Sequence, residues 1–167
     1  MRVLSCDSLL ETHSMEYFQA LSSFGAISDK TVLKLLNEGK IIQLSKGEEV
    51  YHQGATVRGF NVILAGSVSL YVHSSSGLAL THIYSQGEQI GFVGMIALHK
   101  RKGTAVADGS TIVLEIKADQ FFALHESSPQ DFGLLMLNLS REMARTIGDM
   151  GNTISSLRNE LANKGNS

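Results

Sequence analysis

The chain has 167 residues, with 14 Lys and Arg against 16 Asp and Glu, a net charge of −2 and 43% hydrophobic residues. This balance indicates one globular domain, or one domain with an appended helix, and excludes a disordered chain. Because there is no basic excess, a dedicated nucleic-acid-binding protein is not expected. The single cysteine, Cys6, excludes a disulfide framework and a cysteine-built zinc or iron–sulfur site within one chain.

Signals for membrane insertion or export are not found in the sequence. No uninterrupted apolar run reaches the roughly 20 residues that cross a bilayer. Asp7, Glu11 and His13 interrupt the N-terminal segment, so it lacks the apolar core of a signal peptide. We therefore expect a cytoplasmic protein that does not associate with a membrane.

Residues 1–38 predict helices. We expect residues 1–14 to be disordered and a short helix to form around residues 15–21. Ser28 is a candidate N-cap for a second helix, and Gly39 supplies its C-terminal stop. The apolar face of this second helix consists of Val32, Leu33, Leu35 and Leu36.

Residues 39–117 contain 11 of the 16 glycines, which separate short β-rich runs. Such regularly spaced short strands predict an antiparallel barrel or sandwich. Residues 74–77 predict the tip of a hairpin. The predicted strands are Lys40–Leu44, Glu49–His52, Phe60–Leu64, Ser67–His73, Ala79–Ile83 and Thr111–Ile116.

Residues 118–164 predict a short helix over 119–124 and then a long helix to about residue 162. Ser128, Pro129 and Asp131 supply an N-cap, a first helical residue and an acidic first turn. Apolar residues then recur at steps of four and three, which is the a/d pattern of a heptad. This seam predicts a homodimer through the C-terminal helix, and the alternative is a helix folded back on its own barrel. The seam consists of Met143, Ile147, Met150, Ile154, Leu157 and Leu161.

Three glycine-marked segments carry a family resemblance: 47–54, 54–68 and 87–91. In this order and spacing they resemble the cyclic-nucleotide-binding domain family, in its catabolite-activator branch, over about residues 28–162. The resemblance implies an α+β fold, with an antiparallel jelly-roll barrel, N-terminal helices and a long C-terminal dimerisation helix. The implied division is an N-terminal segment (1–14), a binding-like domain (15–127) and a dimer helix (128–164).

In that family a short helix after the "F-G" faces a cyclic phosphate, an arginine binds the phosphate, and a glutamate accepts from the ribose. This chain departs from the pattern at each polar position. Phe92 stands at the glutamate position, and Lys102 stands at the arginine position, counted from Val106. Gly103 replaces the adjoining hydroxyl, with Thr104 one residue further on. Arg101 could substitute for the arginine if the loop shifted by one residue.

The family's phosphate-binding cassette, here residues 91–104, is therefore the candidate ligand site. It is degenerate, because it lacks the family's polar residues. Two readings stay open for the basic run 100–102, an anion clamp or a solvated turn. Phe92 either fills the core or stacks on an aromatic effector. The sequence Ile90-Gly91-Phe92 also resembles the fumarate–nitrate regulators. Their iron–sulfur cluster needs several cysteines, which Cys6 alone cannot supply. The candidate residues are Gly91, Phe92, Val93, Arg101, Lys102, Gly103 and Thr104.

No catalytic or metal-binding pattern is found. None of the six histidines forms an H-x-x-x-H pair, and no G-x-S-x-G elbow occurs. The family's transcription factors place a winged helix-turn-helix after the long helix, whereas this chain stops at Ser167, so DNA binding by it is not expected.

We predict a non-enzymatic, stand-alone regulatory module for signal transduction, which acts on an unidentified protein partner. No cofactor is expected beyond a cyclic nucleotide or another small effector. One alternative is a genuine but altered cyclic AMP or cyclic GMP binder. Another is the sensor half of a Crp/Fnr-like transcription regulator.

Overall fold

The fold of the computed structural model, which describes residues 1–75 and 77–165, is α+β with an antiparallel jelly-roll barrel, as predicted. A five-stranded sheet has the order β1 (Arg2–Leu4), β2 (Lys40–Leu44), β9 (Thr111–Lys117), β4 (Gly59–Ala65) and β7 (Gln89–Ile90). A four-stranded sheet has the order β3 (Glu49–Tyr51), β8 (Thr104–Ala107), β5 (Ser67–Ser74) and β6 (Gly77–Ser85).

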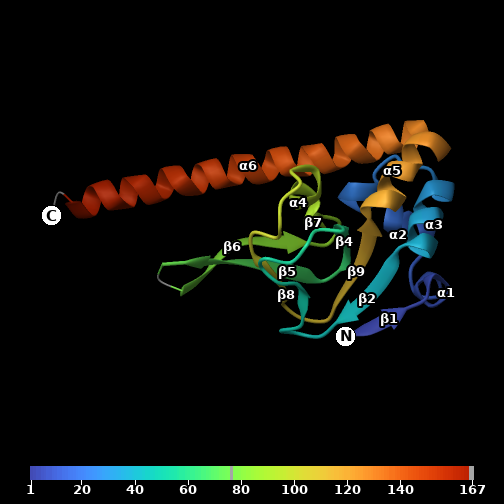
Figure 1. Cartoon of the computed structure of the whole chain (residues 1–167), viewed down its shortest axis with the longest axis horizontal. Coiled ribbons are helices and arrows are strands. Elements are labelled where there is room, and N and C mark those ends of the chain that lie inside the picture. Colours follow the sequence, from blue (N-terminus) through green and yellow to red (C-terminus); the bar gives the residue numbers. More distant parts are fainter. Residues whose placement is uncertain (76, 166–167) are drawn as a thin grey trace.

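The helices are α1 (Cys6–Leu10), α2 (Met15–Gln19), the 3-10 turn η1 (Ser22–Phe24), α3 (Asp29–Glu38), α4 (Phe92–Ile96), α5 (Ala118–Ser127) and α6 (Pro129–Gly165). The helices α1, α2, α3 and α5 gather at one end of the barrel, α4 lies between the barrel and α6, and α6 runs across the barrel and continues beyond it (Figure 1). Within the described part of the chain, none of these helices combines the length and apolarity needed to cross a membrane.

The core has two layers on opposite faces of the five-stranded sheet. Along β4, Phe60, Val62 and Leu64 pack toward the helices, whereas Ile63 packs into the barrel. Both faces of this strand are therefore buried, which explains why Val62, Ile63 and Leu64 are consecutive apolar residues rather than alternating with polar ones. The barrel layer consists of Ile42, Leu44, Ile63, Val68, Ile90, Ala105, Ala107 and Val113.

The N-terminal segment differs from its expectation. We expected residues 1–14 to be disordered, and the structure instead places β1 and α1 there. β1 pairs with β2, and Ser5 caps α1 by accepting from the backbone N–H of Ser8 at 3.1 Å. Leu9 is buried in the helical layer of the core. A single buried leucine in a five-residue helix leaves too short a pattern to be recognised in the sequence.

The six predicted strands all form, with ends that differ by a few residues. β7 and β8 were not predicted, because they have two and four residues and no clear alternation. At the predicted hairpin tip, β5 ends at Ser74 and β6 begins at Gly77, while residue 76 lies outside the described residues.

Gly39 follows the last residue of α3, as predicted, but for another reason than a left-handed stop. Its φ is −74°, a value open to any residue. A Cβ there would lie 2.6 Å from the carbonyl oxygen of Leu35 and 2.7 Å from Cδ1 of Leu114. The glycine thus permits close packing of α3 on β9.

α6 begins at Pro129, directly after Ser128, as the sequence predicts. Its acidic first turn bonds to another helix: the Asp131 carboxylate accepts from the backbone N–H and hydroxyl of Ser28 and from the hydroxyl of Thr31. These bonds join the start of α6 to the start of α3. Partial burial by itself would raise the pKa of Asp131, but these three hydrogen bonds together lower it below its ordinary value.

The second half of α6 carries the predicted heptad seam and leaves the barrel (Figure 1). Ile147 is 70% exposed, and Ile154, Leu157 and Leu161 are more than half exposed. The alternative of a helix folded back on its own barrel does not occur here. Along this exposed apolar row (Ile147, Met150, Ile154, Leu157 and Leu161), the last three side chains have no covering segment among residues 1–75 and 77–165.

Candidate ligand-binding site

A cavity of about 380 Å³ lies between the open side of the barrel, α4 and α6. The barrel contributes Tyr51, Leu70 and Tyr84, and the loop before β8 contributes His99, Arg101, Lys102 and Gly103. α6 closes the cavity with Met143, Thr146, Ile147 and Met150. Three predicted seam residues therefore also line the cavity, a double role that the heptad pattern alone did not indicate.

Gly91 begins α4 in a left-handed conformation, with a φ of +91°. A Cβ at this position would lie 2.1 Å from Nη1 of Arg101, so only glycine fits here. The first N–H of α4 is already bonded, because the backbone N–H of Phe92 donates to Oε1 of Gln89 at 3.1 Å. One N–H of the helix start that the family turns toward a phosphate is therefore bonded within the chain.

Phe92 lies in the core and does not line the cavity. Its ring centroid lies 5.2 Å from that of Phe60 and 5.6 Å from that of Phe121. The sequence left open whether Phe92 fills the core or stacks on an effector, and the structure places it in the core, between α4 and the aromatic residues of β4 and α5. Its neighbour Val93 is half exposed and lines the cavity.

Arg101, rather than Lys102, turns inward, and only 9% of its surface is exposed. Nη1 donates to the carbonyl of Gly91 at 2.8 Å, and Nη2 donates to the carbonyl of Gly59 at 2.8 Å. The guanidinium carbon lies 4.1 Å from the ring centroid of Tyr51, in a cation–π contact. Burial lowers the pKa of Arg101 and raises that of Tyr51.

The remaining cassette residues, Lys102, Gly103 and Thr104, have different surroundings. Lys102 is exposed at the cavity rim. Gly103 packs against β5, where a Cβ would lie 2.5 Å from the carbonyl oxygen of Tyr71. The Thr104 hydroxyl accepts from the backbone N–H of Gln53 at 3.0 Å and does not line the cavity.

A buried carboxylate connects α6 to the segment that leads into α4. Oε2 of Glu142 accepts from the backbone N–H of Gln89 at 2.9 Å, and Oε1 accepts from the hydroxyls of Ser22 at 2.8 Å and Ser23 at 3.0 Å. Burial raises the pKa of Glu142, although these hydrogen bonds act in the opposite direction. Since Gln89 also bonds the first N–H of α4, α6 and α4 share one polar network.

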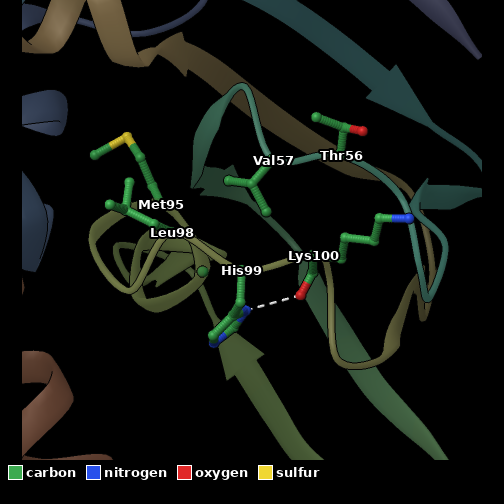
Figure 2. Close-up of a pocket in the computed structure, with 7 residues that line it drawn as sticks. Thr56, Val57, Met95, Leu98, His99 and Lys100 are labelled. Atoms are coloured by element: carbon green, nitrogen blue, oxygen red, sulfur yellow. Dashed lines mark hydrogen bonds between the residues drawn. The ribbon is translucent and has the colours of Figure 1, made fainter.

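A second, smaller hollow of about 280 Å³ lies on the outer side of α4 (Figure 2). Val57 and Met95 line it, and Gly94 and His99 line both this hollow and the larger cavity. Nδ1 of His99 lies 2.8 Å from the carbonyl oxygen of Lys100, which can only accept, so Nδ1 carries the proton. Leu98 has a φ of +54° and is 92% exposed.

No group of three or more His, Cys, Asp or Glu side chains in the described ranges could hold a metal ion.

The cyclic nucleotide-binding domain model matches residues 41–128, which is more than half of the chain. The chain belongs to the cyclic nucleotide-binding domain family. A search of curated proteins found no match. Among solved structures, a cyclic nucleotide-binding domain from Methylobacillus flagellatus is 18% identical, with a TM-score of 0.79 over 93% of this chain and 88% of that one.

Two further solved structures have the same fold. The catabolite activator protein of Thermus thermophilus is 20% identical, with a TM-score of 0.67 over 82% of this chain and 63% of that one. The sensor domain of the transcriptional regulator DNR from Pseudomonas aeruginosa is 18% identical, with a TM-score of 0.63 over 80% of this chain and 91% of that one. At these identities the likeness concerns the fold.

Proposed function

We propose that this chain is a non-enzymatic regulatory module that senses the occupancy of its cavity and passes this state to a partner through paired α6 helices. The observation that carries the proposal is the shared wall of the cavity. Ile147 and Met150 line the cavity and also begin the exposed apolar row of α6, and the partly buried Met143 lines the cavity one turn before them. A ligand that contacts these side chains therefore acts on the residues that would meet a second α6.

The degenerate cassette supports a module that does not take the family's usual nucleotide. The first N–H of α4 is bonded by Gln89, and Arg101 donates to two carbonyls of its own chain. Phe92, at the position of the ribose-binding glutamate, lies in the core. A cyclic nucleotide would find this N–H of α4 and two of the five guanidinium N–H groups already bonded, and its ribose would lack the carboxylate acceptor.

A second candidate function, altered cyclic-nucleotide binding, is favoured by one observation. Arg101 borders the cavity with a positive charge, as the resemblance requires of the phosphate-binding residue. A phosphate could then use guanidinium N–H groups that are not bonded to carbonyls. The two candidates differ in what they predict for cyclic AMP and cyclic GMP.

Sedimentation of the full chain, alone and with millimolar cyclic AMP, cyclic GMP or cyclic di-GMP, tests the proposal. We expect a dimer whose dissociation constant is unchanged by any of the three nucleotides. A strict monomer at tens of micromolar would refute transmission through paired α6 helices. A dimer that one cyclic nucleotide strengthens or weakens would favour the second candidate.

A further inference from the structure

The starting observation is a buried cation without an anionic partner. The guanidinium of Arg101 is nine-tenths buried, yet no carboxylate of the described residues forms an ion pair with it. Glu115 acts on it only at longer range. A guanidinium has five N–H donors, and two of them donate to the carbonyls of Gly91 and Gly59. Burying a charge without a counter-ion is costly, so this arrangement favours an anion in the cavity.

The charges of the cavity wall have one sign and come from one side. Its two cations, Arg101 and Lys102, both belong to the loop before β8. None of the described residues that line the cavity is Asp or Glu. A ligand anion would therefore meet favourable charge at this loop, and the wall offers no carboxylate to accept from ribose hydroxyls.

The opposite wall is apolar and contains two thioethers. Met143, Ile147 and Met150 come from α6, and Val93 comes from α4. Thioether sulfur makes favourable contacts with aromatic rings, and methionine adapts to the shape of a ligand. This wall thus suits a flat, apolar ring rather than a polar sugar.

The size and donor set of the cavity favour a small carboxylate over a phosphate. Its 380 Å³ lies near the lower end of the roughly 300–1,000 Å³ typical of small-molecule sites. A phosphate needs several donors, and the first N–H of α4 is already bonded to Gln89. The guanidinium of Arg101 can bind either anion in a fork, but this one fork contacts both oxygens of a carboxylate and leaves further oxygens of a phosphate to other donors.

We propose that the cavity binds an aromatic monocarboxylate, with its carboxylate at Arg101 and its ring against Met143, Ile147 and Met150. This inference rests on the proposed function, because it names the class of ligand that the regulatory site senses. The ring would contact the first residues of the exposed row on α6, so that binding orders the helix at the point where it leaves the barrel.

The test is calorimetric titration of the full chain with 1-naphthaleneacetate and with its neutral isostere, 1-naphthaleneacetamide. We expect the acid to bind and the amide to bind at least ten-fold more weakly. Equal affinity for the two, or no heat with the acid at millimolar concentration, would overturn the carboxylate assignment. Because both ligands are compared on the natural chain, this result does not depend on any variant folding.

Two variants locate the anion. Arg101→Gln should reduce the affinity for the acid to that for the amide, and Lys102→Gln, an exposed control at the rim, should change it less than three-fold. An unchanged affinity in Arg101→Gln would contradict the placement.

Hydrogen exchange of residues 143–150 separates the two claims. If the amide binds as well as the acid and either one protects this segment, the ligand class is wrong while the proposed function stands. If the acid binds selectively without protecting this segment, the ligand class stands and transmission through α6 is refuted.

Discussion

The apolar row of α6 gives a quantitative prediction for Ile154→Ala. Ile154 lies in the middle of the predicted seam, and 58% of its surface is exposed in the single chain. If two copies pair through this row, the exposed part of Ile154 becomes buried in both of them. The substitution should therefore weaken dimerisation without changing the fold of the barrel.

The size of the effect follows from the area that remains to be buried. Full burial of such a side chain contributes about 1.5–3 kcal/mol. Scaled to the exposed part and counted in two copies, the loss is about 2–3.5 kcal/mol per dimer. Because alanine keeps one methyl group, we expect the lower value, which corresponds to a roughly 30-fold weaker dimer.

Sedimentation equilibrium over a range of protein concentrations measures this dissociation constant. Asn159→Ala is the matched control, since Asn159 is exposed and lies on the opposite side of the heptad. We expect less than a two-fold change for this control. A dissociation constant that Ile154→Ala leaves unchanged, with a dimer still present, would refute pairing through the seam.

Three further predictions concern the cassette and its connection to α6. Phe92→Glu should destabilise the fold by at least about 3–5 kcal/mol in urea unfolding, since it puts a charge into the aromatic core. The control Phe122→Glu, at a half-exposed phenylalanine, should cost under about 1 kcal/mol. Equal effects of the two substitutions would contradict the core placement of Phe92. The left-handed backbone at Gly91 alone would cost an alanine about 1–2 kcal/mol of folding free energy. Gly91→Ala should cost more than this in urea unfolding, because the new Cβ also displaces Arg101. A loss below about 0.5 kcal/mol would show that this contact is absent. The raised pKa of Glu142 adds stability that is fully present below its ordinary pKa of about 4.3 and is lost as pH rises through the raised value. Urea unfolding from acid to neutral pH should therefore show a smaller loss of stability in Glu142→Gln than in the unsubstituted chain. Parallel stability curves for the two proteins would contradict this.

Much of the fold could be predicted because its patterns are long or repeated. The strands of the barrel are apolar runs separated by glycines, and the start of α6 combines Ser128 with Pro129. By contrast, β7 is two residues long and α1 is five residues long, so neither contains a full period of its pattern. Both owe their structure to pairing and burial against distant segments, which a local pattern does not contain.

The orientation of the cassette residues could not be predicted, because a shift of one residue along a strand reverses which side chain faces inward. The loop before β8 has adjacent basic residues at 100–102 and no alternation that would choose between Arg101 and Lys102. The choice depends on the carbonyls of Gly59 and Gly91 and on the ring of Tyr51. These groups are distant in sequence and meet only in the folded barrel.

The position of Phe92 depends on a similar meeting of distant residues. Its partners Phe60 and Phe121 belong to β4 and α5, and the centroids of the three rings lie within 5.6 Å of one another. The family motif gave the place of Phe92 in the cassette, while its inward packing required the neighbouring elements to be known.

Calorimetric titration of the full chain with cyclic AMP tests most directly whether the cassette is closed to the family's nucleotide by its own hydrogen bonds. The account predicts no measurable heat up to millimolar nucleotide. Micromolar binding of cyclic AMP that is lost in Arg101→Gln would contradict it, because the guanidinium would then exchange its bonds to Gly59 and Gly91 for a phosphate.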